Sequence, residues 1–243
     1  MTYRPREFWE QRLSEQFDLR GTGETTLSAD YNRACYTLRA EVLGRALARA
    51  DLDPRGRSVL DVGCGTGFWT AWYLERGALY TGLDIAPTSI ARLSERYPQA
   101  RFLLADISEA DIAGTFDLVN VFDVLYHITD DARWEAALGR LARAVAPGGA
   151  LLVTDVFGEA RGLSEHNKMR SLERYRAVLA ATGLRFTCAP LVSTHALLNR
   201  HLGAWRFLNR APGLLLAIDR VLLATHLAPG PGSNQLLLAR RDG

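Results

Sequence analysis

The pattern of hydrophobic and polar positions changes character at residue 57. From there on, short apolar runs alternate with stretches that carry hydrophobic residues at helical spacing. The runs that predict strands are residues 58–62, 79–83, 100–104, 118–122, 150–156, 184–191 and 235–239. The stretches that predict helices are 68–76, 87–97, 130–146 and 164–182, the last two ended by Pro147-Gly148-Gly149 and Gly183. This alternation predicts an α/β fold, a seven-stranded, mostly parallel sheet with helices on both faces.

Two further regions have helical patterns without intervening strands. Residues 6–17 and 31–50 precede the first strand, and the second of these repeats leucine, valine and alanine at helical spacing. We therefore expect residues 1–55 to form a helical cap or lid over a core of residues 56–243. Residues 193–232 form a helical insert before the last strand. The insert could line an acceptor pocket, form a dimer surface or cover a sheet edge, so a homodimer remains an open alternative.

Composition excludes several classes of protein. Hydrophobic residues make up 48% of the 243 residues and the net charge is +2, which is typical of a globular enzyme and gives no sign of a nucleic-acid partner. The three cysteines are far apart, so we expect neither a disulfide framework nor a zinc site. The leucine-rich residues 213–227 are too short for a membrane span and are interrupted by Asp219 and Arg220. With no signal-peptide pattern at the start, we expect a cytoplasmic protein.

A glycine-rich loop follows the first predicted strand. Val59 and Leu60 lead into Asp61-Val-Gly63-Cys-Gly65-Thr-Gly67, and a helix then begins. A dinucleotide-binding loop would place its third glycine at residue 68, where this chain has Phe68. The acidic Asp61 also disfavours a pyrophosphate and favours a ligand that carries an ammonium group. Such a loop lies at the carboxyl end of its strand, where open α/β sheets bind ligands.

Two more acidic residues follow the next two strands. Asp84, with Ile85 after it, ends the second strand, where a carboxylate can accept hydrogen bonds from both hydroxyls of a ribose. Asp106 and Ile107 follow the third strand. There a carboxylate can accept a hydrogen bond from the adenine amino group, and an apolar side chain can pack on the adenine ring. The strand ends thus predict an adenosine site.

Together these motifs resemble class I, Rossmann-like S-adenosylmethionine-dependent methyltransferases. Asp61 to Gly67 resembles motif I, residues 116–127 resemble motif IV, and residues 141–153 resemble the helix and strand that flank a Pro-Gly-Gly turn. The resemblance implies S-adenosylmethionine as cofactor and S-adenosylhomocysteine as product. The cofactor-binding residues that it implies are Asp61, Gly63, Cys64, Gly65, Gly67, Asp84, Ile85, Asp106, Ile107 and Phe122.

The acceptor side is less defined by the sequence. His127 lies one turn after Asp123 and is the candidate general base, since imidazole can remove a hydroxyl proton near neutral pH. Packing beneath the cofactor is the alternative role. We expect the substrate pocket to include Tyr31, Asp123, Tyr126 and His127. No carboxylate cluster accompanies Asp155, so no metal is expected.

The expected function is methyl transfer to a small molecule, at oxygen, nitrogen or carbon, in natural-product or glycolipid biosynthesis. A nucleic-acid substrate is disfavoured, because the segment after the fourth strand, from Val121 to Tyr126, has no proline. Two alternatives remain at this stage. One is a non-catalytic S-adenosylmethionine-binding scaffold, and the other is a nicotinamide-dependent oxidoreductase.

Overall fold

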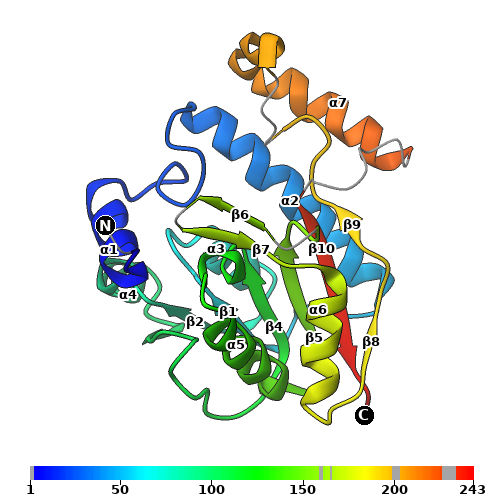
Figure 1. Ribbon diagram of the computed structural model, residues 1–243. Coiled ribbons are helices and arrows are strands. Elements are labelled where there is room, and N and C mark those ends of the chain that lie inside the picture. Colours follow the sequence, from blue (N-terminus) through cyan, green and yellow to red (C-terminus); the bar gives the residue numbers. More distant parts are fainter. Residues whose placement is uncertain (1–2, 159–160, 165, 199–202, 226–233) are drawn as a thin grey trace.

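The computed structural model describes residues 3–158, 161–164, 166–198, 203–225 and 234–243 (Figure 1). Its strands are β1 (Ser58–Val62), β2 (Leu79–Asp84), β3 (Arg101–Leu104), β4 (Phe116–Phe122), β5 (Val145–Asp155), β6 (Arg161–Ser164), β7 (Asn167–Met169), β8 (Phe186–Cys188), β9 (Val192–Ser193) and β10 (Gln235–Arg241). Its α-helices are α1 (Pro5–Glu15), α2 (Ala29–Arg49), α3 (Phe68–Leu74), α4 (Pro87–Arg96), α5 (Asp131–Ala144), α6 (Leu172–Ala181) and α7 (Pro212–Ala224). Two short 3-10 helices are η1 (Leu125–His127) and η2 (Gly203–Arg210).

The main sheet has the strand order β3-β2-β1-β4-β5-β10-β8. Strands β1 to β5 pair in parallel, and β10 pairs antiparallel with β5, β8 and β9. The strand order therefore reverses between β1 and β4. In open α/β sheets such a reversal leaves a crevice at the carboxyl ends of the strands, where ligands bind. The expected fold class, a mostly parallel sheet in an α/β protein, is confirmed.

Successive side chains of the central strands point to opposite faces, and each face is covered by different helices. Leu60 and Val62 of β1 pack with α5 and α6, whereas Val59 packs with α2 and α3. Trp134 of α5 and Tyr73 of α3 are among the largest fully buried side chains on the two sides. Hydrophobic runs without alternation, such as 150–153, arise because both faces are buried.

The strand count differs from the expected seven. The run expected at 184–191 is a strand only in β8, β9 lies directly after that run, and the β6–β7 hairpin forms a second sheet. Phe186–Cys188 and Val192–Ser193 pair separately with β10, and Pro190 lies between them. Proline has no amide hydrogen and cannot donate to the sheet, which explains the interruption. β9 therefore pairs with β10 as an additional strand beside the seven-strand order.

The helix expected at 164–182 is wrong in its first half. α6 begins at Leu172, where the Ser171 side chain accepts a hydrogen bond from the Arg174 amide and caps the helix. The preceding residues instead form the β6–β7 hairpin. The helix expected at 130–146 also ends earlier, because β5 begins at Val145 and includes the Pro-Gly-Gly turn. The other predicted helices and strands of the core lie within a few residues of their expected bounds.

The insert packs on the cap instead of on the sheet. α7 lies against α2 (Figure 1). Leu215 of α7 is fully buried in one cluster with Tyr31, Ala34 and Leu38 of α2. The Asp219 carboxylate accepts hydrogen bonds from three successive amides, those of Ala196, Leu197 and Leu198. Residues 199–202 and 226–233 of the insert lie outside the described residues. Its helical pattern is confirmed in α7 and η2.

Candidate functional site

A cavity of about 270 Å³ lies at the carboxyl ends of β1, β2, β3 and β4. The loop after each of these strands contributes to its wall, and so do parts of the N-terminal segment. Eight of the ten residues predicted to bind the cofactor line it: Gly63, Cys64, Gly65, Asp84, Ile85, Asp106, Ile107 and Phe122. The strand reversal therefore brings the predicted residues to one place.

The amides of the glycine-rich loop already donate hydrogen bonds inside the protein. Those of Gly63 and Cys64 donate to the Leu83 carbonyl, at 2.7 Å and 3.2 Å. The Gly65 amide donates to the Asp84 carboxylate at 2.8 Å, and the Gly67 amide donates to the Cys64 carbonyl. A loop that binds pyrophosphate needs such amides directed at the ligand. These four amides are therefore not available to a pyrophosphate.

Two predicted cofactor residues do not line the cavity. Gly67 is the N-cap of α3 with a φ of +85°, and a Cβ there would lie 2.5 Å from Leu93 of α4. A glycine is thus favoured at position 67 by the positive φ and by the close packing of α4. Asp61 is 1% exposed and accepts hydrogen bonds from the Tyr80 hydroxyl and the Asn120 amide. Burial raises the pKa of Asp61 to about 6, with the two hydrogen bonds opposing that rise.

Asp84 and Asp106 are held in fixed orientations at the cavity wall. One oxygen of Asp84 accepts from Gly65 and the other from the Ala86 amide, at 2.9 Å. One oxygen of Asp106 accepts from the amide and hydroxyl of Ser108, and the other accepts from Arg133 at 2.9 Å. Since each carboxylate oxygen has two lone pairs, both residues keep acceptor capacity for a ligand.

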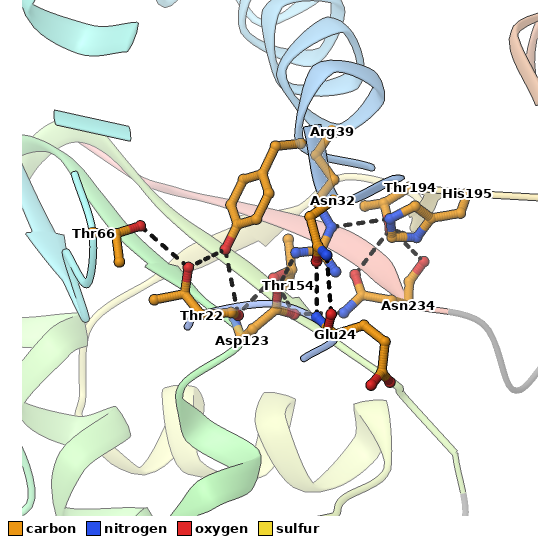
Figure 2. Close-up of polar contacts among 11 residues, drawn as sticks. Thr22, Glu24, Asn32, Arg39, Thr66, Asp123, Thr154, Thr194, His195 and Asn234 are labelled. Carbon is orange, nitrogen blue, oxygen red and sulfur yellow. Dashed lines mark hydrogen bonds and ion pairs between the residues drawn. The ribbon is translucent and has the colours of Figure 1, made fainter. Parts of the chain in front are cut away.

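The cap forms the opposite wall. Tyr3, Pro5, Trp9 and Leu13 of the α1 region line the cavity, as do Thr22 and Tyr36. α1 is attached to the core by Glu10, whose carboxylate accepts from the Thr88 amide at 2.9 Å and from its hydroxyl at 2.7 Å. The Tyr36 hydroxyl donates to the Thr22 hydroxyl at 2.9 Å, and Thr22 in turn lies 3.4 Å from the Thr66 hydroxyl (Figure 2). The cap and the glycine-rich loop thus meet at the cavity.

His127 lies at the cavity in a cluster of rings. Its ring centroid is 4.9 Å from that of Trp9, edge to face, and 5.9 Å from that of His166. Nδ1 lies 3.0 Å from the His166 carbonyl oxygen, so Nδ1 carries the hydrogen and donates it, leaving Nε2 as an acceptor. Burial lowers the pKa of His127 to about 4. The imidazole is therefore neutral near pH 7.

Asp123 follows β4 with a φ of +58°, an unusual backbone conformation for a residue other than glycine. It forms an ion pair with Arg39 of α2, and it accepts hydrogen bonds from Thr154 at 3.1 Å and Asn234 at 2.7 Å. The Arg39 Nε also donates to His195 at 3.0 Å (Figure 2). Burial would lower the pKa of Arg39, but the Asp123 carboxylate raises it above its usual value, so Arg39 stays charged.

Of the predicted substrate-pocket residues, Asp123 and His127 line the cavity and Tyr31 and Tyr126 do not. Tyr31 of α2 is 1% exposed and packs in one cluster with Leu215 of α7. Residues that sequence reasoning missed are Thr22, Arg39 and Arg133, whose partners are distant in sequence. The described residues of the insert are also absent from the wall.

The described residues contain no group of three histidine, cysteine or carboxylate side chains placed to hold a metal ion. Asp155, considered above for this role, accepts a hydrogen bond from the buried Tyr175 hydroxyl, and burial raises its pKa to about 7. In the described part of the chain, no helix is both long enough and apolar enough to cross a membrane.

Comparison with known proteins places the site in context. Residues 59–149 match the family model described as "Methyltransferase domain". The chain is 30% identical over 158 residues to malonyl-[acyl-carrier protein] O-methyltransferase from Serratia marcescens, a match that covers 64% of this chain and 61% of that one. The chain spans less than two thirds of the length of the curated relatives it matches first.

Solved structures share the fold at low sequence identity. A Burkholderia thailandensis 1,6-didemethyltoxoflavin-N1-methyltransferase, with its substrate and S-adenosylhomocysteine bound, aligns with a TM-score of 0.56 and 20% identity, covering 98% of this chain and 86% of that one. The cyclase SpnF aligns with a TM-score of 0.56 and 19% identity, covering 84% and 80%. A single fold thus serves both kinds of protein.

Proposed function

Since this chain belongs to the class I, Rossmann-like family of S-adenosylmethionine-dependent methyltransferases, we propose that it methylates a small-molecule acceptor and releases S-adenosylhomocysteine. The acceptor atom is oxygen, nitrogen or carbon, and natural-product or glycolipid biosynthesis is the proposed setting, in the cytoplasm. One observation carries the proposal. A single cavity is lined by the glycine-rich loop and by the acids that end β2 and β3.

The residues present fit the cofactor. Asp84 keeps lone pairs for the ribose hydroxyls, and Asp106 with Ile107 offers an acceptor and an apolar surface for adenine. Phe122 and Tyr36 provide aromatic surface that can attract a sulfonium by cation–π interaction. For Asp61 we propose an indirect role, in which its hydrogen bonds to Tyr80 and Asn120 hold the start of the loop.

When bound, S-adenosylmethionine supplies the methyl group, and the electron pair of the broken carbon–sulfur bond stays on sulfur. The protein aligns the acceptor, excludes water and takes up a proton where the acceptor loses one. His127 is the proposed proton acceptor, at Nε2, because its Nδ1 hydrogen is directed at the His166 carbonyl. The pKa of His127, lowered to about 4 by burial, keeps Nε2 unprotonated near pH 7 and also makes it a weaker base than an exposed imidazole.

We propose that residues 1–55 act as the lid of this site. Trp9 and Leu13 of α1 and Tyr36 of α2 line the cavity from the cap side. The Glu10–Thr88 hydrogen bonds attach α1 to α4. Removing residues 1–30 should then impair both cofactor retention and acceptor binding, because these residues contribute to one continuous wall.

Calorimetric titration tests the cofactor. S-adenosylmethionine and S-adenosylhomocysteine should bind, and NADH should not, because the loop amides are already bonded within the protein. NADH binding in preference to S-adenosylmethionine would favour the oxidoreductase alternative.

A second assay tests catalysis. Release of S-adenosylhomocysteine should be measured across hydroxyl, amine and carbon acceptors. Cofactor binding without release from any acceptor would favour the scaffold alternative.

A further inference from the structure

Two polar residues at the acceptor side of the cavity offer hydrogen-bond acceptors. Asp123 presents a carboxylate and His127 presents the unprotonated Nε2, and both line the cavity. They lie four residues apart in the segment that follows β4. The nearby hydroxyls of Thr22 and Tyr36 are bonded to each other and can act in either sense, so they do not favour donors or acceptors in a ligand.

The guanidinium of Arg39, which pairs with Asp123, already has its hydrogen-bond partners inside the protein. Arg39 pairs with Asp123 through Nη1 and donates from Nε to His195, and it does not line the cavity. Among the described residues of the wall, the one arginine is Arg133, which pairs with Asp106 and Glu109 beyond the third strand. A ligand carboxylate beside Asp123 would therefore meet another negative charge with no free cation to offset it.

The carboxylate of Asp123 is also held in place. Thr154 and Asn234 donate to one oxygen, and Arg39 donates to the other (Figure 2). Of the roughly four lone pairs that a carboxylate offers, these three donors leave one for a ligand. Asn234 is fixed in turn by Thr194, whose hydroxyl lies 2.9 Å from both the carbonyl and the side-chain oxygen of Asn234.

We propose that this site selects acceptors that present a neutral hydrogen-bond donor, a hydroxyl or an N–H group, and rejects carboxylates. Asp123 binds the donor group, and Arg39 is a positioning residue that holds the Asp123 carboxylate in its orientation. The inference rests on the proposed function and names its substrate class. In the reaction, the acceptor oxygen or nitrogen forms a bond to the methyl carbon, its proton passes to His127 Nε2, and the carbon–sulfur electron pair stays on sulfur.

The test uses three matched probes, 4-ethylphenol, 4-ethylaniline and 4-ethylbenzoate, with the full chain saturated in S-adenosylhomocysteine. At pH 7.5 the first two are neutral and the third is an anion. The phenol and the aniline should bind about 10-fold or more tightly than the benzoate, as expected when a buried group is left beside a like charge. Equal binding of the three, preference for the benzoate or binding of none would overturn the inference.

Variants assign the selectivity to residues. Asp123→Asn removes the negative charge and frees Arg39, so the ratio of phenol to benzoate affinity should fall by about 10-fold or more. Arg39→Met should weaken phenol binding and raise the KM for the acceptor, with the affinity for S-adenosylmethionine unchanged. Arg39→Lys should restore part of the phenol affinity. An unchanged ratio in Asp123→Asn would contradict the role of Asp123. Asn234→Ala, which removes one donor to Asp123, provides a milder second variant should Arg39→Met fail to fold.

Failure of this inference is distinguishable from failure of the proposed function. If S-adenosylmethionine does not bind, the proposed function fails whatever the probes do. If S-adenosylmethionine binds and the carboxylate probe is preferred, the methyltransferase assignment stands and the acceptor class proposed here is wrong.

Discussion

The two ends of the cavity are built in different ways. The cofactor end comes from residues 63–107, whose loops follow successive neighbouring strands of the sheet. The acceptor end is assembled from distant segments, since Arg39 is 84 residues from Asp123 and 156 from His195, and Asn234 is 111 from Asp123. The residues proposed to bind the cofactor thus lie on one topological unit, whereas those proposed to select the acceptor include residues from α2 and from the position directly before β10.

The largest effect should come from the cofactor end. Asp84→Ala removes the carboxylate proposed to accept the ribose hydroxyls, which should weaken S-adenosylmethionine binding by about 3 kcal/mol, roughly 100-fold. Calorimetry measures this affinity, and Asp111→Ala is the matched control because its carboxylate is 95% exposed and pairs only with Arg140 among the described residues. If Asp84→Ala binds S-adenosylmethionine as tightly as the control, the Asp84 carboxylate does not bind the cofactor.

At the acceptor end, His127 should make the free energy of unfolding depend on pH. Its pKa in the folded state is about 4, below the ordinary 6.5, so the unfolded chain takes up a proton that the folded chain refuses. The stability that the neutral ring contributes is therefore present above pH 6.5 and is lost as the pH falls towards 4. Between pH 7.5 and 4.5, the unfolding free energy of the native chain should fall by about 2–3 kcal/mol more than that of His127→Gln.

Urea denaturation at the two pH values measures this difference. Parallel losses of stability in the two proteins would mean that His127 titrates normally in the folded chain. In the assay of S-adenosylhomocysteine release, His127→Gln also separates catalysis from cofactor binding. If His127 is the base, turnover should fall steeply in His127→Gln while affinity for S-adenosylmethionine survives; near-normal turnover would remove His127 as the base.

The smallest expected effect tests whether the cap connects the two ends. Glu10→Ala removes two hydrogen bonds from α1 to Thr88, a loss of about 1 kcal/mol, so S-adenosylmethionine should dissociate several-fold faster. Glu7→Ala is the control, because Glu7 lies on the same helix, is exposed and pairs with Arg4. Equal dissociation rates in the two variants, measured by stopped-flow, would show that α1 does not retain the cofactor.

The sequence predicted the core of the fold because its signals are local. Residues 58–62 form a strand as expected, and the acids that follow β2 and β3 reach the cavity since parallel strands end at the same edge. The β6–β7 hairpin was not predicted because residues 164–171 contain a single hydrophobic residue, Met169, and so lack the alternation typical of strands. Ser171, the N-cap of α6, was the local signal for the start of the helix.

The acceptor end could not be predicted in the same way. Nothing near Arg39 in the sequence distinguishes it from the other arginines, and its partners become neighbours only after α2 packs over the sheet. The surroundings of Asp61 could not be predicted either. Its position in the motif indicated contact with the ligand, but Tyr80 and Asn120, from neighbouring strands β2 and β4, enclose its carboxylate. The roles assigned to individual site residues, the boundaries of the cap and homodimerisation stay predictions.

The internal hydrogen bonds of the glycine-rich loop have a consequence for the kinetics of binding. The amides of Gly63, Cys64, Gly65 and Gly67 are satisfied by Leu83, Asp84 and Cys64, so folding itself fixes the course of this loop. A ligand that binds there does not have to order a flexible segment, and little of its binding energy is lost as chain entropy. Association at this end of the cavity should then be limited by diffusion and by access past α1, with no slow rearrangement of the loop.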